Sequence, residues 1–467
     1  MDNRPKDSTF KTTVLLVATL ASFLTPFMGS SINIALPSIG REFTMDAVLL
    51  GWVATSYLLS AAVFLVPCGR ISDIYGRKRI FTYGIIIFTF TSLLLSISDS
   101  AAMLIAFRIL QGIGAAMVFG TGVAMITSVF PAGERGRALG INVAAVYLGL
   151  SLGPLLGGLL TENFGWRSIF LVNIALGLVI VAFLYLKLKG EWAEAKGEKF
   201  DLVGSVIFGL AVAAIIYGLS ILPNFSGIFV ILAGILGVIL FIKWETNVPS
   251  PILHMDLFRR NRIFAFSNLA ALINYSATFA VAFLLSLYLQ YIKGYGPQTA
   301  GFILVAMPVV QAMLSPAAGR LSDKIEPRII ASVGMALTTV GLVFLVFIKQ
   351  DTGIAYIIFS LVILGLGFAL FSSPNTNAVM GSVGKRSYGI ASATLATMRQ
   401  IGMMLSMGIA MVLFAVYIGR VEITPQNYPD FVTSLRVAFG IFTVLCFGGI
   451  FASLSRGKVR LMESIQR

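Results

Sequence analysis

Cysteine, histidine and charged side chains are all scarce in this chain. Its 467 residues include two cysteines, one histidine and only 12% Asp, Glu, Lys and Arg, against 57% hydrophobic residues. Cys68 and Cys446 stand alone in apolar stretches, so they provide neither a disulfide framework nor a metal-binding spacing, and we expect both to be packing residues. A single histidine excludes a histidine-based metal or catalytic cluster. So few charges also exclude an ordinary soluble domain.

Acidic residues are less frequent than basic ones, with 20 Asp and Glu against 34 Lys and Arg and a formal net charge of +14. In a soluble protein this imbalance would favour a nucleic-acid partner. Here the basic residues lie in short segments between long apolar runs, where the topology of a membrane protein explains them. We therefore expect the lipid bilayer, and no nucleic acid, as a partner of this chain.

Apolar runs of about 20 residues, enough to cross a hydrocarbon core of about 30 Å as a helix, recur along the whole chain. The mean hydropathy of +0.92 agrees with this pattern. The sequence predicts an all-α polytopic membrane protein with fourteen transmembrane helices. The predicted spans are 12–37, 49–69, 79–97, 101–128, 136–162, 166–187, 202–221, 226–242, 263–291, 298–319, 328–348, 353–380, 387–418 and 434–455.

The distribution of Lys and Arg predicts the orientation of these spans. If the N-terminus is cytoplasmic, most basic residues fall in cytoplasmic segments. This bias places both termini in the cytoplasm, in a multi-pass protein of the cell membrane, and agrees with an even number of spans. The outer loops hold only Arg41, Arg167, Lys293, Lys349, Arg420 and Arg436, and two arginines lie within spans, Arg108 and Arg399.

A five-residue motif occurs twice, as Gly69-Arg70-Ile71-Ser72-Asp73 and as Gly319-Arg320-Leu321-Ser322-Asp323. Each copy follows the second span of a group of six. The repetition predicts two pseudo-symmetric six-helix bundles, 1–188 and 263–467, with linkers and a central two-helix hairpin in 189–262. Two bundles built on one plan are typical of a transporter that tilts about a central site.

The two pentads, together with the basic residues after the first, predict a cytoplasmic gate. Asp73 can pair with Arg77 one helical turn later, and such a cluster can hold two helices in one state and release them in another. The alternative is a positively charged loop with an incidental acid, which does not explain the recurrence. An acid and a proline follow the second copy, so we expect the first copy to be the principal gate. The predicted gate residues are Gly69, Arg70, Asp73, Gly76, Arg77, Lys78, Gly319, Arg320 and Asp323.

The fourth span contains Arg108, with Gln111 and Gly112 on the same helical face. An arginine at this depth should face a partner or a watery cavity rather than lipid. The alternative is a side chain that reaches back to the membrane surface.

The fifth span contains a stripe of small residues, on which another helix can pack closely. Its proline removes one backbone hydrogen bond and bends the helix. The stripe is either an ordinary packing seam or a seam that slides or opens between the bundles. Its residues are Gly149, Gly153, Pro154, Gly157 and Gly158.

These three stretches, in this order, resemble the major facilitator superfamily over essentially the whole chain. The fifth-span stripe, the Asn33-Ile34-Ala35-Leu36-Pro37 end of the first span and the Gly165-Trp166-Arg167 stretch before the sixth resemble the fourteen-span drug:proton antiporter family. The resemblance implies alternating access, export of hydrophobic and often cationic compounds, and energy from an inward flow of protons without a bound cofactor.

The chain departs from that family in its acids. Many members have an acidic residue in the first span where this sequence has Met28. On the predicted boundaries the middle of the membrane contains no carboxylate and no histidine, only Arg108 and Arg399. A cationic substrate would therefore meet no buried counter-charge, and proton coupling would lack a membrane-buried acid. The arginines favour a neutral or anionic lipophilic substrate, and the remaining candidates for carrying protons are Glu42, Asp46, Asp73, Glu162 and Asp323.

Polar side chains in the predicted spans are candidates for a substrate cavity, with interhelical hydrogen bonding as the alternative for each. Arg399 stands out because it lies near the middle of its span. The candidates are Asn33, Asn274, Tyr275, Gln290, Gln311, Asn375, Asn377, Arg399 and Gln400.

From the residues and the resemblance together, we expect a monomeric alternating-access secondary transporter, not an enzyme, that exports lipophilic small molecules by proton-coupled antiport. One alternative is an uncoupled facilitator or an importer of a small neutral or anionic solute. A more remote alternative is a membrane enzyme or receptor without transport. That alternative would need a metal cluster, a nucleophile-base pair or a sizeable soluble domain, and the sequence contains none of these.

Overall fold

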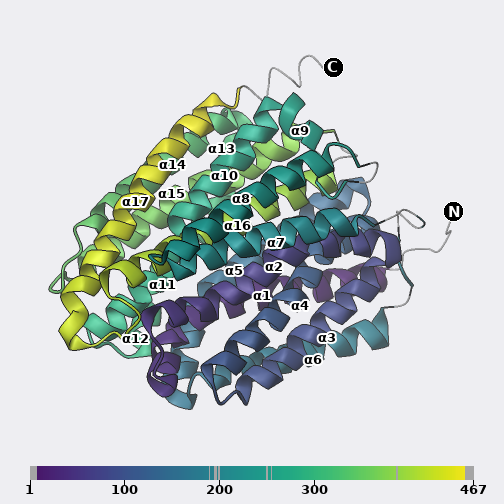
Figure 1. Ribbon diagram of the computed structural model, residues 1–467. Helices are drawn as coiled ribbons and strands as arrows, with labels where there is room; N and C mark the ends of the chain where they lie inside the picture. Colours follow the sequence, from purple (N-terminus) through teal and green to yellow (C-terminus); the bar gives the residue numbers. More distant parts are fainter. Residues whose placement is uncertain are drawn as a thin grey trace.

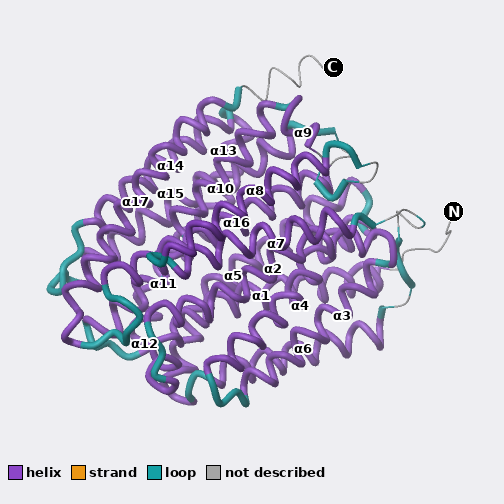
Figure 2. The backbone as a smooth tube through the Cα atoms, viewed as in Figure 1, coloured by secondary structure: helices purple, strands orange, loops and turns teal. Residues whose placement is uncertain are grey.

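The computed structural model describes residues 8–188, 190–193, 197, 200–248, 251–253, 255–384 and 388–457. Within these residues it contains helices and loops and no strand (Figure 2). Fourteen of the described helical segments are long and apolar enough to cross a membrane, which confirms the predicted number of spans. In chain order the elements are α1 (Ser8–Phe43), α2 (Ala47–Tyr75), α3 (Arg77–Ser96), α4 (Ala101–Val129), α5 (Ala132–Phe164), α6 (Arg167–Lys187), α7 (Leu202–Ile221), α8 (Phe225–Glu245), α9 (Met255–Arg260), α10 (Arg262–Thr278), α11 (Ala280–Leu287), the π-helix η1 (Tyr288–Ile292), α12 (Pro297–Leu304), α13 (Ala306–Lys324), α14 (Pro327–Val346), α15 (Ile354–Gly381), α16 (Tyr388–Tyr417), the 3-10 helix η3 (Pro425–Asn427) and α17 (Tyr428–Ser455).

The helices form two bundles with a hairpin beside them (Figure 1). In the first bundle, α1 packs on α5 and α6, and α4 packs on α2 and α3. In the second bundle, α15 packs on α13 and α14, while α17 packs on α10 and α14. The hairpin consists of α7 and α8, and α7 contacts both α2 and α16. The end of the molecule at which α1 begins and α17 ends is called the terminal end below, and the opposite end is called the far end.

Both pentads lie inside helices rather than in loops, which corrects the predicted placement of the first copy. α2 continues through its pentad and ends before Gly76, whose φ of +120° is a conformation that few residues other than glycine adopt. Ser72 Oγ donates a hydrogen bond to the carbonyl oxygen of Gly69 at 2.6 Å. The equivalent Ser322 Oγ donates to the carbonyl oxygen of Gly319 at 2.7 Å. The two copies therefore share one local geometry.

Equivalent helix pairs in the two bundles also touch through equivalent glycines. Between α3 and α4, a Cβ added to Gly84 would lie 2.9 Å from the carbonyl oxygen of Gly114. Between α14 and α15, a Cβ added to Gly334 would lie 2.7 Å from the carbonyl oxygen of Gly367. Both pairs need glycine for the two backbones to approach, as expected for close helix contacts in a membrane. The repeat in the sequence thus extends to the packing.

The two bundles meet at the far end, where α5 packs against α12. A Cβ added to Gly158 would lie 2.5 Å from the carbonyl oxygen of Pro297, and one added to Gly301 would lie 2.2 Å from that of Pro154. Any side chain larger than hydrogen would push these backbones apart. Gly158 and Pro154 therefore belong to the contact between the bundles.

The other three glycines of the predicted stripe, Gly149, Gly153 and Gly157, face α1 within the first bundle. A Cβ added to Gly149 would lie 2.5 Å from the carbonyl oxygen of Phe23, and one added to Gly157 would lie 2.9 Å from Cα of Ser31. Ser31 Oγ also donates to the carbonyl oxygen of Gly153 at 3.0 Å. For these three glycines, the expectation of a seam that opens between the bundles is wrong, because they form a packing seam inside one bundle.

The neighbouring glycines Gly157 and Gly158 offer a matched pair of variants. We expect Gly158→Val to hold α5 and α12 apart and open the far end while the first bundle stays folded. We expect Gly157→Val, which overpacks α5 against α1, to lower the free energy of unfolding by about 1–3 kcal/mol.

Two measurements separate these effects. One is the melting temperature, and the other is the rate at which a cysteine introduced by Ser286→Cys reacts with a membrane-impermeant maleimide. Ser286 is fully buried in the structure. Faster labelling is expected for Gly158→Val, and a lower melting temperature for Gly157→Val. Labelling of the Gly158→Val protein at the rate of the parent protein would show that this glycine contact does not keep the far end closed.

Candidate functional site

A proline leaves one carbonyl oxygen of α1 available for a bond between the bundles. Pro37 has no amide hydrogen, so the carbonyl oxygen of Asn33, four residues earlier, lacks its usual helical donor. Ser286 Oγ of α11 donates to this oxygen at 2.7 Å, and Gln290 Nε2 of η1 donates to the carbonyl oxygen of Ile34 at 2.9 Å. Asn33 and Gln290 are 5% and 3% exposed, so in this structure both lie in the far-end contact, and their place in a substrate cavity stays a prediction.

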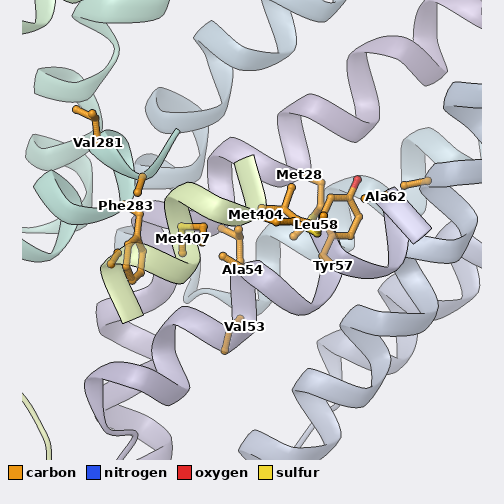
Figure 3. Packing of buried hydrophobic residues seen from close by; sticks show 14 of the residues in the cluster. Met28, Val53, Ala54, Tyr57, Leu58, Ala62, Val281, Phe283, Met404 and Met407 are labelled. Atoms are coloured by element: carbon orange, nitrogen blue, oxygen red, sulfur yellow. The ribbon is translucent and has the colours of Figure 1, made fainter. Parts of the chain in front are cut away.

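Apolar side chains extend the contact between the bundles along α2 and α16. Figure 3 shows Met404 and Met407 of α16 beside Ala54 and Leu58 of α2 and Met28 of α1, all of them buried. Methionine is flexible and fills irregular gaps, so such surfaces can repack. Because no ion pair joins these side chains, separating them leaves no charge unpaired.

Exposure along one face of α5 shows where the bundles separate. Pro154 and Gly158 are buried in the far-end contact. About two turns closer to the terminal end, Tyr147 is half-buried, and beyond it Ala144 and Gly140 are exposed. On this face of α5 the bundles are therefore in contact at the far end, and the face is exposed toward the terminal end.

Arg399 of α16 lies on the terminal side of the methionine contact, among aromatic side chains. Its guanidinium carbon lies 5.6 Å from the centre of the Tyr275 ring, and its Nη2 donates to Thr376 Oγ1 at 2.6 Å. Tyr275 meets Phe368 edge to face, with ring centres 5.2 Å apart. Tyr147 of α5, in the first bundle, belongs to the electrostatic surroundings of Tyr275. These five residues, called the Arg399 cluster below, come from both bundles.

The polar groups of this region retain unused hydrogen-bonding capacity. Nε of Arg399 is buried and has no hydrogen-bond partner among the described residues. Asn274, the neighbour of Tyr275, is fully buried, and neither side-chain atom of its amide has a partner there. Gln400, which follows Arg399, is half-buried. Because a guanidinium carries five N–H donors, Arg399 can bind further acceptors.

Asn375, another predicted cavity residue, has a structural position instead. It is 1% exposed, its Nδ2 donates to the carbonyl oxygen of Ser267 at 3.1 Å, and its Oδ1 accepts from Arg456 Nη1 at 2.9 Å. Sequence reasoning missed Arg456, since it follows the last span and looks like an ordinary tail residue. Burial lowers the pKa of Arg456 to about 9, so its guanidinium stays charged at neutral pH.

Two further candidates stand apart from the Arg399 cluster. Asn377 of α15 is exposed and donates to Ser322 Oγ at 2.6 Å. Gln311 of α13 is buried, and its carbonyl oxygen accepts from Ser315 Oγ at 2.7 Å. Neither side chain hydrogen-bonds to Arg399 or Tyr275.

Arg108 of α4 is enclosed within the first bundle and is 1% exposed. Its Nε donates to a backbone carbonyl oxygen of α2 at 3.0 Å, its Nη1 donates to Gln111 Oε1 at 2.6 Å, and its guanidinium carbon lies 4.2 Å from the centre of the Tyr57 ring. Gln111 Nε2 donates in turn to Ser92 Oγ of α3 at 2.9 Å. A Cβ on Gly112 would lie 2.4 Å from the carbonyl oxygen of Tyr57, so glycine allows α4 to approach α2 here. The arginine therefore meets partners, as predicted, and ties three helices together.

In the described spans, every carboxylate lies within the first or last turns of its helix, as the sequence indicates. Met28 is fully buried, and its sulfur accepts a hydrogen bond from Asn173 Nδ2 at 3.1 Å. The described residues also contain no group of three His, Cys, Asp or Glu that could hold a metal ion. In this part of the chain, Arg108 and Arg399 thus have no buried acidic counterpart.

Two acids at the far end are engaged in polar contacts. Glu42 of α1 forms an ion pair with Arg167 at 2.7 Å and accepts from Trp166 Nε1 at 2.6 Å, which ties α1 to α6. Glu162 of α5 accepts from the backbone amide of Gln298 at 2.8 Å, at the start of α12. Glu162 therefore adds a bond between the bundles to the far-end contact.

The predicted pair at the first pentad is present. Arg77 Nη2 lies 2.7 Å from Asp73 Oδ1, and Nε donates to the same oxygen at 2.8 Å. Nη1 of Arg77 donates to Ser128 Oγ at the end of α4. Arg70, one turn before the pair, is half-buried. The cluster joins the terminal ends of α2, α3 and α4, all in the first bundle.

A residue from the linker after α6 adds to the predicted gate cluster, and sequence reasoning missed it. The carboxylate of Glu191 accepts from the backbone amides of Lys78 at 2.8 Å and Arg79 at 3.1 Å, in the first turn of α3. A carboxylate is favourable there because the N-terminus of a helix carries partial positive charge. The amide of Arg77 also donates to the carbonyl oxygen of Trp192 at 2.8 Å. No motif marks Glu191, so only the folded chain reveals this contact.

The second pentad differs from the first in the residues that come after it. Pro327 occupies the first position of α14, where the first copy is followed by basic residues. Gly319 and Arg320 lie near the terminal end of α13, and Arg320 is exposed. The side chain of Asp323 lies outside the described residues, so the weaker second gate stays a prediction.

The arrangement of two similar bundles around a shared face matches a known family. The sequence profile of the Major Facilitator Superfamily matches residues 18–407 and, in a second match, 267–459. The chain belongs to this superfamily. Among curated members of it, the chain is 31% identical to the riboflavin transporter RibZ of Clostridioides difficile, over 94% of this chain and 95% of RibZ. It is 33% identical to the multidrug resistance protein Stp of Mycobacterium tuberculosis, over 83% of this chain and 73% of Stp.

A solved superfamily structure has the same fold. It is a bacterial homolog of the human lysosomal transporter Spinster in an inward-facing and unoccupied conformation, with a TM-score of 0.71 and 17% identity. The match covers 96% of this chain and 98% of that one. The superfamily and these relatives are transporters, so the chain is a transporter rather than an enzyme.

The structure gives Arg108 a structural role, which Arg108→Ala tests. The substitution leaves Gln111 and a backbone carbonyl oxygen of α2 without their donor, at a cost of about 1–3 kcal/mol. We expect a lower melting temperature and less folded protein, with unchanged substrate preference in the protein that folds. Arg436→Ala, at an exposed arginine, is the control. A normally folded Arg108→Ala protein with altered substrate preference would contradict this assignment.

The gate is tested by Asp73→Asn, which removes the charge that holds Arg77. We expect transport to fall by about tenfold or more, because the two conformational states lose part of their energy difference, while membrane insertion stays normal. Glu134→Gln is the matched control, since Glu134 pairs with Lys11 at 2.8 Å and lies outside the pentad cluster. Normal flux in Asp73→Asn, measured in proteoliposomes, would overturn the gate.

Proposed function

We propose that the chain is an alternating-access secondary transporter that exports lipophilic small molecules by proton-coupled antiport. It acts as a monomer in the cell membrane with both termini in the cytoplasm, so the terminal end is the cytoplasmic end. The one-sided contact between the bundles carries this proposal. Bundles that meet at the far end and separate toward the terminal end correspond to an inward-facing state, in which a central site takes up substrate from the cytoplasmic side.

Three observations support export. The chain is similar to a relative named for multidrug resistance. Its first, fifth and sixth spans resemble the fourteen-span drug:proton antiporter family. The accessible face also presents aromatic and apolar side chains, which suit lipophilic compounds.

Acids at the two ends of the helices support coupling to protons. Glu162 accepts a hydrogen bond across the far-end contact, so its protonation from outside would weaken the closed far end. Asp73 pairs with Arg77 at the terminal end, so its protonation from the cytoplasm would weaken the gate. Carboxylates at both ends thus provide proton-sensitive contacts, although the described spans contain none in their middles.

A second candidate is an uncoupled facilitator or an importer of a small neutral or anionic solute. The similarity to the relative named as a riboflavin transporter favours it, because the match covers nearly all of both chains. The lack of a central carboxylate in the described spans agrees with transport without proton coupling.

Flux in sealed proteoliposomes distinguishes the two functions. The purified protein is tested with lipophilic cations, neutral compounds and anions, with and without an imposed pH gradient. For the antiporter, we expect substrate flux to rise when protons flow in the opposite direction and to collapse when an ionophore removes the gradient. Flux that ignores the gradient would favour the facilitator, and protein-free liposomes give the background.

A further inference from the structure

The two arginines within the spans differ in what their charges meet. Arg108 is 1% exposed and is surrounded by a carbonyl oxygen, the Gln111 amide and a tyrosine ring. Arg399 is half-buried, and among the described residues it donates a hydrogen bond only to the neutral hydroxyl of Thr376, while its buried Nε has no partner there. A guanidinium binds a negatively charged acceptor more strongly than a neutral one, and half-buried Arg399 has no such acceptor among the described residues.

The neighbours of Arg399 restrict the shape of a ligand that could supply this acceptor. Tyr275 and Phe368 form an edge-to-face pair beside the guanidinium, and Tyr147 of the other bundle belongs to the electrostatic surroundings of Tyr275. Aromatic side chains favour flat aromatic ligands, through offset-stacked or edge-to-face contacts worth about 0.5–1.5 kcal/mol each. No carboxylate of the described residues pairs with Arg399, so the cluster offers no ionic partner to a cation.

We infer that Arg399 is the substrate-binding residue of this transporter and that its substrates are flat aromatic compounds carrying an anionic oxygen, such as an aromatic carboxylate or phenolate. The oxygen accepts hydrogen bonds from the guanidinium, and the ring lies against Tyr275 and Phe368. This inference rests on the proposed function and specifies its substrate class. The position fits such a role, since the cluster lies on the accessible side of the far-end contact and includes residues of both bundles.

Binding and flux are measured with three probes that share one ring system, 1-naphthoate, 1-naphthamide and 1-naphthylmethylamine. Binding to the purified protein in detergent gives the ratio of affinities for the anion and the cation. We expect this ratio to be about tenfold or more in the unsubstituted protein, as a charge-assisted hydrogen bond provides. Arg399→Gln should abolish the preference while leaving binding of the neutral amide within about twofold, and Arg399→Lys should restore part of it. Arg436→Gln, at an exposed arginine, is the control with an unchanged ratio.

The outcomes separate this inference from the proposed function. Absence of anion preference in the unsubstituted protein, or an unchanged preference in Arg399→Gln, overturns the substrate class, whatever the flux measurements show. Failure of the protein to move any compound of the wider panel faster than protein-free liposomes overturns the proposed function instead. A general loss of stability in Arg399→Gln would lower binding of all three probes equally, so the ratio between probes identifies recognition of charge.

Discussion

The hydroxyl of Ser286 bonds to the carbonyl oxygen that Pro37 leaves without a helical donor, and this bond joins two bundles whose neighbouring contacts are largely apolar. Inside a membrane an unpaired carbonyl costs several kcal/mol, so a proline within a span requires a donor from elsewhere. The second bundle supplies that donor when the far end is closed. In the alternating-access cycle proposed above, the far end opens and water can replace this donor. The same oxygen would then be satisfied in both states, and the contact would be reversible.

The remaining packing between the bundles is close backbone packing and apolar side-chain packing, and neither kind leaves an unpaired charge when it separates. Glycines bring the backbones of α5 and α12 together, and methionines fill the space between α2 and α16. The hairpin touches both sides of the latter contact, because α7 packs on α2 and on α16. Arg420, after α16, donates to the carbonyl oxygen of Ser220 at 2.9 Å, which ties the hairpin to the second bundle. The hairpin thus lies beside the contact between α2 and α16 and touches both bundles there.

The functional features are distributed between the two bundles rather than repeated in both. The first bundle holds the enclosed Arg108 and the predicted gate pair of Asp73 and Arg77. Glu191, from the linker that leads to the hairpin, bonds to the start of α3 beside this pair. The second bundle holds Arg399, whose Nε has no hydrogen-bond partner among the described residues. A duplicated chain has therefore kept its pseudo-symmetric packing, seen in the equivalent glycine contacts, while its charged residues have different environments.

Much of the architecture could be predicted from the sequence, because it depends on local properties. The length and apolarity of each run determine whether it spans a membrane, and the four-residue spacing of Asp73 and Arg77 determines that they can pair.

The environment of each polar residue could not be predicted in this way. Arg108 and Arg399 are both single arginines in apolar spans, and adjacent glycines of α5 face different bundles. The sequence by itself determined the spans, the repeat and the scarcity of central acids. Only the tertiary structure decided which arginine is enclosed and which is available, because that depends on helices brought together from distant parts of the chain.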